Sequence, residues 1–320
     1  MTEASRPPTV RRALASETRR LQASSPSPRL DVEILLAFVL GLRRERLYAE
    51  PERVLTAAEQ QALHALVSRR AAHEPVAYLT GVKAFHEIEV GVTSDTLIPR
   101  PETETLVEVA LEKLAALAAG SRPRPRVVEA GPDGAPASGA PGVSAAAEQL
   151  RVLDVGTGSG AVALAIVHAR ADVVAVGVDV QPRALEQARL NAERLGLAGR
   201  CRFLASDLFA DVPVGSLFDL IVSNPPYVAD HELAATPPDV HAFEPAAALL
   251  GGPDGLDFYR RIVPAATLFL ETGGYLAVEI AESRADAVVE IFRAAGRYEP
   301  VEVRDDLGGR PRVVVGRERA

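Results

Sequence analysis

The most constraining feature of this sequence is the alternation of short apolar runs with helical segments from residue 150 to the C-terminus. Seven runs have the length and composition of strands: 151–156, 173–179, 202–207, 218–223, 275–280, 298–304 and 312–317. Helices are predicted between them over 160–169, 182–195, 256–271 and 283–295. This pattern predicts an α/β fold with a doubly wound sheet, closed at one side by an antiparallel hairpin.

The residues before this region predict a different organisation. Residues 10–74 are expected to be helical, with a capping box at Thr56–Glu59. One helix is expected to use a single face, composed of Leu30, Ile34, Leu35, Phe38 and Val39. The sequence therefore predicts a small helical domain over 1–80.

A hairpin and an insert complete the predicted layout. Residues 82–92 change towards period two, which indicates a hairpin within a linker over 81–100. The third domain, 101–320, is expected to begin with a helix from Pro101 to about Ala119. Within this domain, the Ala-, Pro- and Gly-rich stretch 121–149 is predicted to be a flexible insert.

Charge and cysteine content limit the classes of partner. The formal net charge is −8, which disfavours a protein that coats nucleic acid. The arginine excess in residues 1–53 is interpreted as a solvated helix surface, with a small basic face as the alternative. Cys201 is the single cysteine and the histidines lack ligand spacing, so no metal site is expected. No secretory signal or membrane span is apparent, and we expect a cytoplasmic protein.

A glycine-rich loop joins the first predicted strand of the sheet to its helix. It has the sequence LDVGTGSG, and glycines there let the backbone turn tightly and approach a ligand. The residues expected to line the ligand are Gly156, Thr157, Gly158, Ser159 and Gly160. Asp179 ends the next strand, where a carboxylate can accept hydrogen bonds from both hydroxyls of a ribose. A nucleoside site is therefore predicted at this edge of the sheet.

Two further carboxylates narrow the choice of nucleotide. Gly156, Gly158 and Ala161 also satisfy the dinucleotide pattern G-x-G-x-x-G/A. Asp154, however, places a negative charge before the first glycine, which is unfavourable beside a pyrophosphate and suits a cationic methionyl group. Asp207 ends the third strand, where it can accept from an adenine amino group. We therefore expect S-adenosylmethionine as cofactor; the alternative for Asp154 is that it only caps the loop amides.

Asn224, Pro225, Pro226 and Tyr227 follow the fourth strand, where open α/β sheets bind ligands. The two prolines lack N–H donors, so the segment is a rigid run of acceptors that suits an NH₂ group. Holding both N–H bonds of a planar amide favours a pyramidal transition state for attack on a methyl group. We expect a backbone carbonyl to hold the Asn224 amide so that its oxygen faces the substrate, and Tyr227 to stack on the substrate or face the sulfonium. The alternative is an ordinary turn.

These motifs together resemble the bacterial protein-(glutamine-N5) methyltransferases that modify peptide chain release factors. Matching segments lie between Asp31 and Arg317, outside the insert: EPVAYLTG, Lys83-Ala-Phe, TLIPRPETE, LDVGTGSG, VDVQPRAL, SDLF, SNPPY, GGPDGLDFYRRI and DLGGRPRVVVG. The chain departs from the family in its insert and in Ala281, where the family often has glycine.

The resemblance implies a Rossmann-like, seven-stranded methyltransferase sheet with a small N-terminal helical domain that binds substrate. It implies that the glycine loop, Asp179, Asp207 and Leu208 contact S-adenosylmethionine. It further implies that Asn224 to Tyr227 hold the glutamine amide, with Asn224 serving both sites, and that Phe85, Pro99 and Arg100 wall the substrate pocket. The implied partner is the release-factor domain with the Gly-Gly-Gln loop.

Three other functions stay open at this point. An adenine-N6 methyltransferase would use the same tetrapeptide but needs a basic nucleic-acid surface. A non-catalytic scaffold that retains the cofactor would not need Asn224 and Tyr227. The hypothesis of a nicotinamide oxidoreductase depends on Ala161, which completes the dinucleotide pattern, and the sequence shows no apparent proton donor beside the loop.

Overall fold

A computed structural model describes residues 8–120 and 149–319, so the predicted insert lies almost wholly outside the described residues. The chain divides into two compact units. The first comprises residues 1–83, 91–98 and 231–249, and the second comprises 84–90, 99–230 and 250–320. Segment 231–249, which the sequence analysis assigned to 101–320, therefore groups with the helical unit.

The first unit is built from helices around an apolar core. The helices of this core are α1 (Val10–Leu21), α2 (Pro28–Leu40), α3 (Arg44–Ala49), α4 (Ala57–Ala71) and α5 (Val76–Thr80). The unit also includes α9 (Pro238–His241) and short 3₁₀ turns at Leu233–Ala235 and Ala246–Ala248, which contain no buried residue. The capping box predicted at Thr56 is confirmed, since the Thr56 side chain accepts from the Glu59 amide while the Glu59 carboxylate accepts from the Thr56 amide. A buried ion pair of 2.6 Å joins Arg70 to Asp31 inside this unit.

The predicted apolar face of α2 is partly wrong. Leu30 and Phe38 are 41% and 51% exposed, whereas Val32, Leu35 and Leu36 are fully buried. The reason is that α1 and α4 both pack on α2, and the side on which they lie selects which apolar residues become core.

The second unit contains the predicted seven-stranded sheet. Its strands are β3 (Leu150–Val155), β4 (Val173–Asp179), β5 (Cys201–Ala205), β6 (Phe218–Ser223), β7 (Leu270–Glu279), β8 (Tyr298–Asp305) and β9 (Pro311–Glu318). They lie in the order β5-β4-β3-β6-β7-β9-β8, with β9 antiparallel to both of its neighbours. The closing antiparallel hairpin is therefore confirmed. A separate two-stranded sheet, β1 (Val82–Phe85) with β2 (Ile88–Gly91), corresponds to the predicted hairpin.

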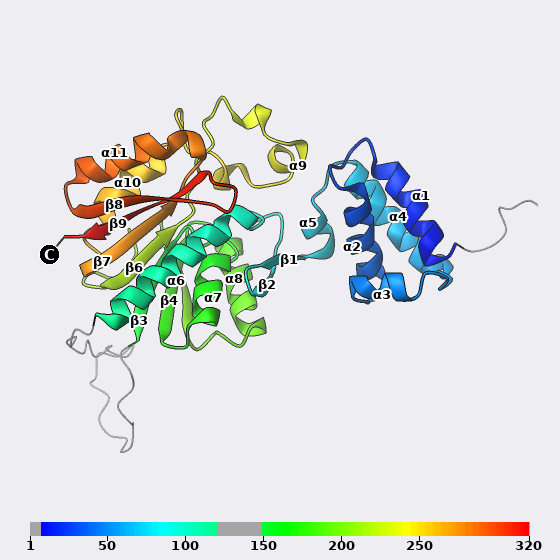
Figure 1. Ribbon diagram of the computed structural model, residues 1–320, viewed down its shortest axis with the longest axis horizontal. Coiled ribbons are helices and arrows are strands. Elements are labelled where there is room, and N and C mark those ends of the chain that lie inside the picture. The colour runs from blue at the N-terminus through cyan, green and yellow to red at the C-terminus, as the bar shows by residue number, and fades with distance from the viewer. Residues whose placement is uncertain (1–7, 121–148, 320) are drawn as a thin grey trace, which may run out of the picture. The chain divides into compact units, whose positions relative to one another are not determined.

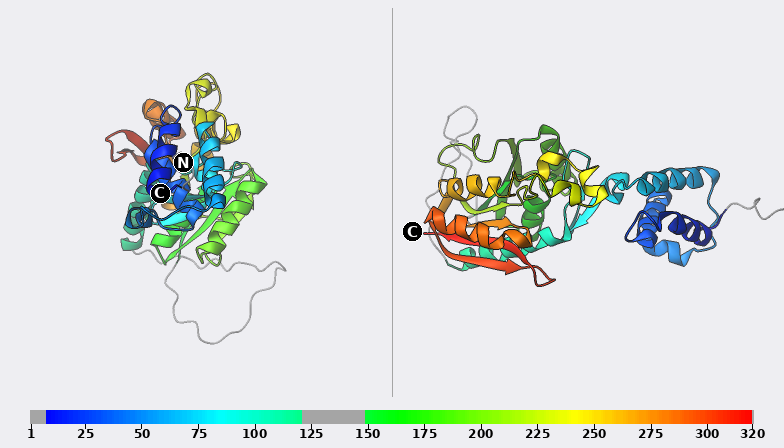
Figure 2. Two further views of the ribbon diagram at one scale, coloured as in Figure 1. Left: turned by 90° about the vertical axis from the view of Figure 1, so that its right-hand side faces the viewer. Right: turned by 90° about the horizontal axis from the view of Figure 1, so that it is seen from above.

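Helices cover both faces of the seven-stranded sheet (Figure 1, Figure 2). Three helices pack side by side in the order α6 (Glu104–Ala119), α7 (Ala161–Ala169) and α8 (Pro182–Arg194). A 3₁₀ turn at Pro101–Thr103 directly precedes α6. Helices α10 (Asp257–Ala266) and α11 (Ala285–Ala295), the latter preceded by a 3₁₀ turn at Glu282–Arg284, pack together against the later strands. In the part of the chain that the structure describes, no helix is long and apolar enough to cross a membrane.

The predicted helix over 256–271 is too long. Helix α10 ends at Ala266, and β7 already begins at Leu270, so Gly273 and Gly274 lie inside a strand rather than at a helix end. The register between β6 and β7 shifts at this point, and Gly273 has a φ of 80°. A Cβ on Gly274 would lie 2.8 Å from the carbonyl oxygen of Asp219, which explains why glycine is needed in this irregular part of the strand.

Candidate active site

The site lies where the strand order reverses. Val155 at the end of β3 pairs with Val178 of β4 on one side and with Ser223 of β6 on the other. The Ser223 hydroxyl also donates a 2.7 Å hydrogen bond to the carbonyl of Val155. The segments that follow these residues therefore start from one edge of the sheet, at the switch point where such folds bind ligands.

The glycine loop has the conformation that the sequence predicts. Gly156, Gly158 and Gly160 have φ angles of 76°, 54° and 81°, all in the left-handed region. A Cβ on Gly156 or Gly158 would meet nothing within 4 Å, so this side of the loop is open. A Cβ on Gly160 would lie 3.1 Å from Ala188 of α8, so the third glycine allows close packing inside the fold.

Asp154 supports the loop from the inside. Its side chain is buried, and Oδ2 accepts hydrogen bonds from the Thr157 hydroxyl at 2.7 Å and the Ala163 amide at 3.2 Å. Burial raises its pKa to about 6. The alternative role, capping of the loop amides, is not what these contacts show, because the donors are a hydroxyl of the loop and an amide in the first turn of α7 (Ala161–Ala169).

Asp179 ends β4 beside the loop. Its Oδ2 accepts from the Gly158 amide and its Oδ1 from the Gln181 amide, both at 2.9 Å. Each carboxylate oxygen has a second lone pair, so both can still accept a hydroxyl group of a ribose. Asp179 therefore shapes the loop as well as offering the predicted acceptors.

Asp207 and Leu208 follow β5. Asp207 is exposed and its Oδ2 accepts a 2.7 Å hydrogen bond from Arg261 of α10. Leu208 has a φ of 55°, and the Ser206 hydroxyl donates to its carbonyl at 3.0 Å. The turn that presents both residues is thus held by local hydrogen bonds, and Arg261 is a partner that the sequence analysis did not identify.

The tetrapeptide begins directly after β6. The Asn224 amide nitrogen donates to the hydroxyl of Thr103 at 3.2 Å, so the expected backbone carbonyl is replaced by a side-chain hydroxyl. Thr103 is buried at the end of the 3₁₀ turn before α6. Since the NH₂ group points to Thr103, the amide oxygen of Asn224 lies on the opposite side of the amide and remains an acceptor.

A second glycine segment packs against the tetrapeptide backbone. A Cβ on Gly251 would lie 2.6 Å from the Pro226 carbonyl oxygen, and a Cβ on Gly255 would lie 2.4 Å from the carbonyl oxygen of Tyr227. The Gly251 amide donates to the Val228 carbonyl at 2.8 Å. Segment 250–255 therefore holds the tetrapeptide at a distance that only glycine permits.

Tyr227 and Glu279 form the buried end of the site. Desolvation raises the pKa of the Tyr227 phenol, and the nearby Glu279 acts in the same direction. Glu279 is fully buried at the end of β7, and burial raises its pKa to about 7. The neutral phenol of Tyr227 thus persists across the physiological range.

The three predicted pocket-wall residues belong to the same unit as the tetrapeptide. Arg100 is half-buried, and its positive charge partly opposes the rise in the pKa of Tyr227. Phe85 and Pro99 are buried. Arg100 is therefore the member of this set with a described electrostatic interaction with the tetrapeptide.

Thr103, Glu279 and the 250–255 segment were not predicted as site residues. For Glu279 a signal existed, since a carboxylate at the carboxyl end of a strand has the same position in the sequence pattern as Asp179. Thr103 and the glycines lie within the segments TLIPRPETE and GGPDGLDFYRRI, but nothing in those segments reveals contact with Asn224 or Tyr227.

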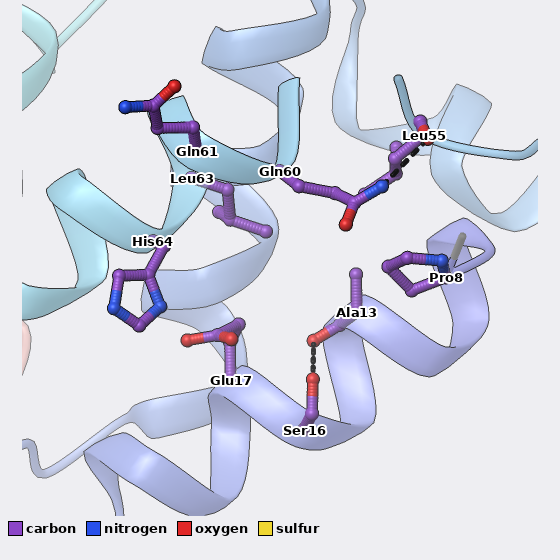
Figure 3. Close-up of a pocket in the computed structure, with 9 residues that line it drawn as sticks. All are labelled: Pro8, Ala13, Ser16, Glu17, Leu55, Gln60, Gln61, Leu63 and His64. Carbon is purple, nitrogen blue, oxygen red and sulfur yellow. Dashed lines mark hydrogen bonds between the residues drawn. The ribbon is translucent and has the colours of Figure 1, made fainter. Parts of the chain in front are cut away.

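The helical unit contains a pocket of about 310 Å³ between α1 and α4. Figure 3 shows Gln60 and Ser16 in it, each hydrogen-bonded to a carbonyl, of Leu55 and Ala13 respectively. Glu17, also in its lining, forms an ion pair with Arg20. These polar groups thus already have partners, and the lining includes no residue of the glycine loop or the tetrapeptide.

The sheet, the open glycine loop and the tetrapeptide after β6 define a Rossmann-like, S-adenosylmethionine-dependent methyltransferase. The positive φ angles and the open space beside Gly156 and Gly158 form a cradle that fits the cofactor, which Asp179 would hold by its ribose. Residues 12–81 match the family model described as PrmC N-terminal domain, and residues 143–247 match the Methyltransferase small domain.

The chain is similar to release factor glutamine methyltransferases along almost its whole length. That of Koribacter versatilis is 39% identical, over 97% of this chain and 99% of the relative. That of Moorella thermoacetica is 38% identical over 95% and 96%, and that of Salmonella typhimurium 38% identical over 92% and 93%. The chain therefore belongs to the release factor glutamine methyltransferase family.

Among solved structures, the hMettl16 catalytic domain in complex with MAT2A 3′UTR hairpin 6 has a TM-score of 0.52. It is 12% identical in sequence and covers 80% of this chain and 91% of its own. At this level of identity the likeness concerns the fold alone.

Proposed function

We propose that the protein transfers a methyl group from S-adenosylmethionine to the side-chain amide nitrogen of the glutamine in the Gly-Gly-Gln loop of a peptide chain release factor. Family membership supports the reaction and the class of substrate. The observation that carries the proposal is the hydrogen bond from Asn224 to Thr103, because it leaves the Asn224 oxygen to accept from an NH₂ group.

The residues of the tetrapeptide orient the substrate rather than react with it. The Asn224 oxygen and the carbonyls around the two prolines accept the N–H groups of the substrate amide, with no backbone donor in Pro225 or Pro226 to compete. S-adenosylmethionine supplies an electrophilic methyl group. Fixed acceptors favour the pyramidal nitrogen of the transition state without reorganisation, which is electrostatic preorganisation. Tyr227 provides a neutral aromatic surface for the planar amide or the sulfonium.

The cofactor contacts are assigned to the loop and to the strand ends beside it. The backbone of Gly156 to Gly160 approaches the cofactor, Asp179 accepts from its ribose, and Asp207 with Leu208 holds the adenine. Asp154 keeps the loop in shape through Thr157 and, when ionised, would supply a negative charge that suits the cationic methionyl group. Phe85, Pro99 and Arg100 are assigned to the wall of the substrate pocket.

The helical residues 1–80 are assigned to the binding of the release factor, and residues 81–100 form a linker to the methyltransferase domain. The protein is assigned to the cytoplasm. Direct binding to nucleic acid is not expected, because the net charge is −8. The same charge and the family membership disfavour an adenine-N6 methyltransferase. A scaffold without activity is disfavoured by the complete acceptor set at Asn224.

The test uses purified protein, labelled S-adenosylmethionine, and a release factor with the loop glutamine intact or replaced by alanine. We expect label on the intact factor alone. Label on the replaced factor would contradict the assignment of the acceptor, and label on DNA or RNA alone would favour the nucleic-acid alternative.

A further inference from the structure

Glu279 lies beside Asn224 at the edge of the sheet. Val278 pairs with Ser223 across the parallel strands β7 and β6, so the next residue of each strand, Glu279 and Asn224, are neighbours. The Tyr259 phenol donates a 2.8 Å hydrogen bond to the Glu279 carbonyl and fixes the end of β7.

The Glu279 carboxylate is an acceptor without a well-formed hydrogen bond. The residue is fully buried, and neither oxygen has a hydrogen-bond partner of good geometry in the residues that the structure describes. Leaving such a group unsatisfied is costly, so a buried carboxylate needs donors nearby. The hydroxyl groups near enough to act on this carboxylate are those of Thr103 and Tyr227, since both side chains oppose the rise in the pKa of Glu279 that burial causes.

Thr103 connects this carboxylate to the substrate acceptor. Its hydroxyl accepts a hydrogen bond from the Asn224 amide at 3.2 Å. A hydroxyl has one hydrogen to donate and can accept at the same time. With its oxygen engaged by Asn224, Thr103 has its hydrogen free for a buried acceptor, and Glu279 supplies one.

We propose that Glu279 is a positioning residue that sets the orientation of the Asn224 amide through Thr103 and holds the phenol of Tyr227. When ionised Glu279 accepts from Thr103, the Thr103 oxygen must accept from the Asn224 NH₂ group. The Asn224 oxygen is then the atom presented to the substrate. Without the carboxylate, Thr103 can donate to the Asn224 oxygen instead, and the amide turns its NH₂ group towards the substrate NH₂, where two donors repel each other.

The kinetic test of this inference rests on the proposed function. It compares Thr103→Val, Thr103→Ser, Glu279→Gln and the double variant that combines Thr103→Val with Glu279→Gln. Serine keeps the hydroxyl and valine removes it with little change in shape. We expect Thr103→Val and Glu279→Gln each to lower kcat about 10- to 100-fold, as expected for a misplaced reacting group, without changing cofactor affinity. Thr103→Ser should retain most activity. The double variant should be no slower than the slower single variant, because both act through Asn224.

The pH profile separates positioning from mere support of the fold. Wild-type kcat should rise as the pH increases through about 7, where Glu279 ionises, and the rise should be absent in Glu279→Gln. The other charged or titratable groups that act on Glu279 or are acted on by it are Glu102, Tyr227, Tyr259 and Arg312. The Glu279→Gln comparison keeps all of them in place.

A readout on the protein alone tests the inference if the release factor is not methylated. The side-chain ¹⁵NH₂ resonances of Asn224, assigned with Asn224→Ala, should shift as the pH passes through about 7, and this shift should vanish in Thr103→Val and in Glu279→Gln. Independent, multiplying effects of the two substitutions on kcat, or an Asn224 titration that persists in Thr103→Val, would overturn the proposal. Failure of the wild type to methylate any release factor would instead overturn the proposed function.

Discussion

The guanidinium group of Arg261 on α10 donates a 2.7 Å hydrogen bond to Oδ2 of Asp207, which lies 54 residues earlier in the chain. The two side chains are 49% and 60% exposed, so the pair contributes little to the free energy of unfolding. Its effect is local: it engages one carboxylate oxygen of Asp207 and leaves the other for the adenine amino group that the sequence analysis predicts.

Substitution of Asp207 and of Arg261 should separate the role of the Asp207 carboxylate as adenine acceptor from the role of Arg261 in orienting it. Asp207→Ala is expected to weaken S-adenosylmethionine binding about 10-fold, as for the loss of one hydrogen bond to a charged group. Arg261→Gln should weaken it only about 2- to 3-fold, because the carboxylate remains and loses just its orientation. Calorimetric titration measures both, and an unchanged affinity in Asp207→Ala would remove Asp207 from the adenine site.

Asp179→Ala should weaken cofactor binding more strongly than Asp207→Ala. It removes the predicted ribose acceptors and also frees the amides of Gly158 and Gln181, so the loop loses its shape. We expect a loss of affinity of about 100-fold and a small decrease in Tm. Asp179→Asn is the matched control, since it keeps one acceptor and should retain part of the affinity. Equal affinities for wild type and Asp179→Ala would show that this carboxylate serves only the loop.

Asn224→Ala should lower turnover by ~10²–10³ with little change in cofactor affinity, because it removes a preorganised acceptor. Asn224→Asp should retain more turnover, since a carboxylate oxygen still accepts from the substrate NH₂. Single-turnover methylation of a release factor checks the order wild type, Asp, Ala. Near-complete activity in Asn224→Ala would require the substrate amide to be held elsewhere.

Gly255→Ala tests the clamp on the tetrapeptide. Its Cβ would lie 2.4 Å from the Tyr227 carbonyl oxygen, so the tetrapeptide or the 250–255 segment must shift. We expect turnover to fall at least about 10-fold. Gly309→Ala is the matched control, because Gly309 has the same φ of 74° but nothing within 4 Å of its Cβ position. Both variants carry a left-handed strain of about 1–2 kcal/mol, so equal losses of turnover would exclude a role for the contact with Tyr227.

The stability of Glu279→Gln should depend on pH differently from that of the wild type. The folded-state pKa of about 7 lies above the ordinary value of 4.5 for a glutamate, so the folded protein binds the proton more tightly. The wild-type free energy of unfolding therefore decreases as the pH rises between these two values. The difference, variant minus wild type, should therefore increase by about 3 kcal/mol from pH 4.5 to pH 7 and stay constant above. The buried Asp154 titrates in both proteins and cancels. Denaturant unfolding at several pH values measures the difference, and a pH-independent value would show that Glu279 is not buried as described.

Local sequence was informative wherever function depends on backbone conformation or on residue type at a strand end. The three glycines of the loop needed no tertiary partner to be recognised, because their left-handed φ angles follow from the turn between strand and helix. Asp179 and Asn224 were predicted as site residues from their position at the ends of apolar runs. Periodicity was less reliable for helix faces and helix ends. It predicted an apolar face on α2 that includes the exposed Leu30 and Phe38, and it extended α10 into β7.

The sequence by itself determined the order of strands and helices, the glycine loop and the acceptor tetrapeptide, since each is encoded within a few consecutive residues. Only the tertiary structure decided what holds the tetrapeptide. Thr103 stands 121 residues before Asn224, and Gly255 meets Tyr227 through a loop whose glycines look like an ordinary turn. Such hydrogen bonds and close contacts depend on which distant segments of the chain meet in the fold. No local pattern of residue types specifies how close two such segments come.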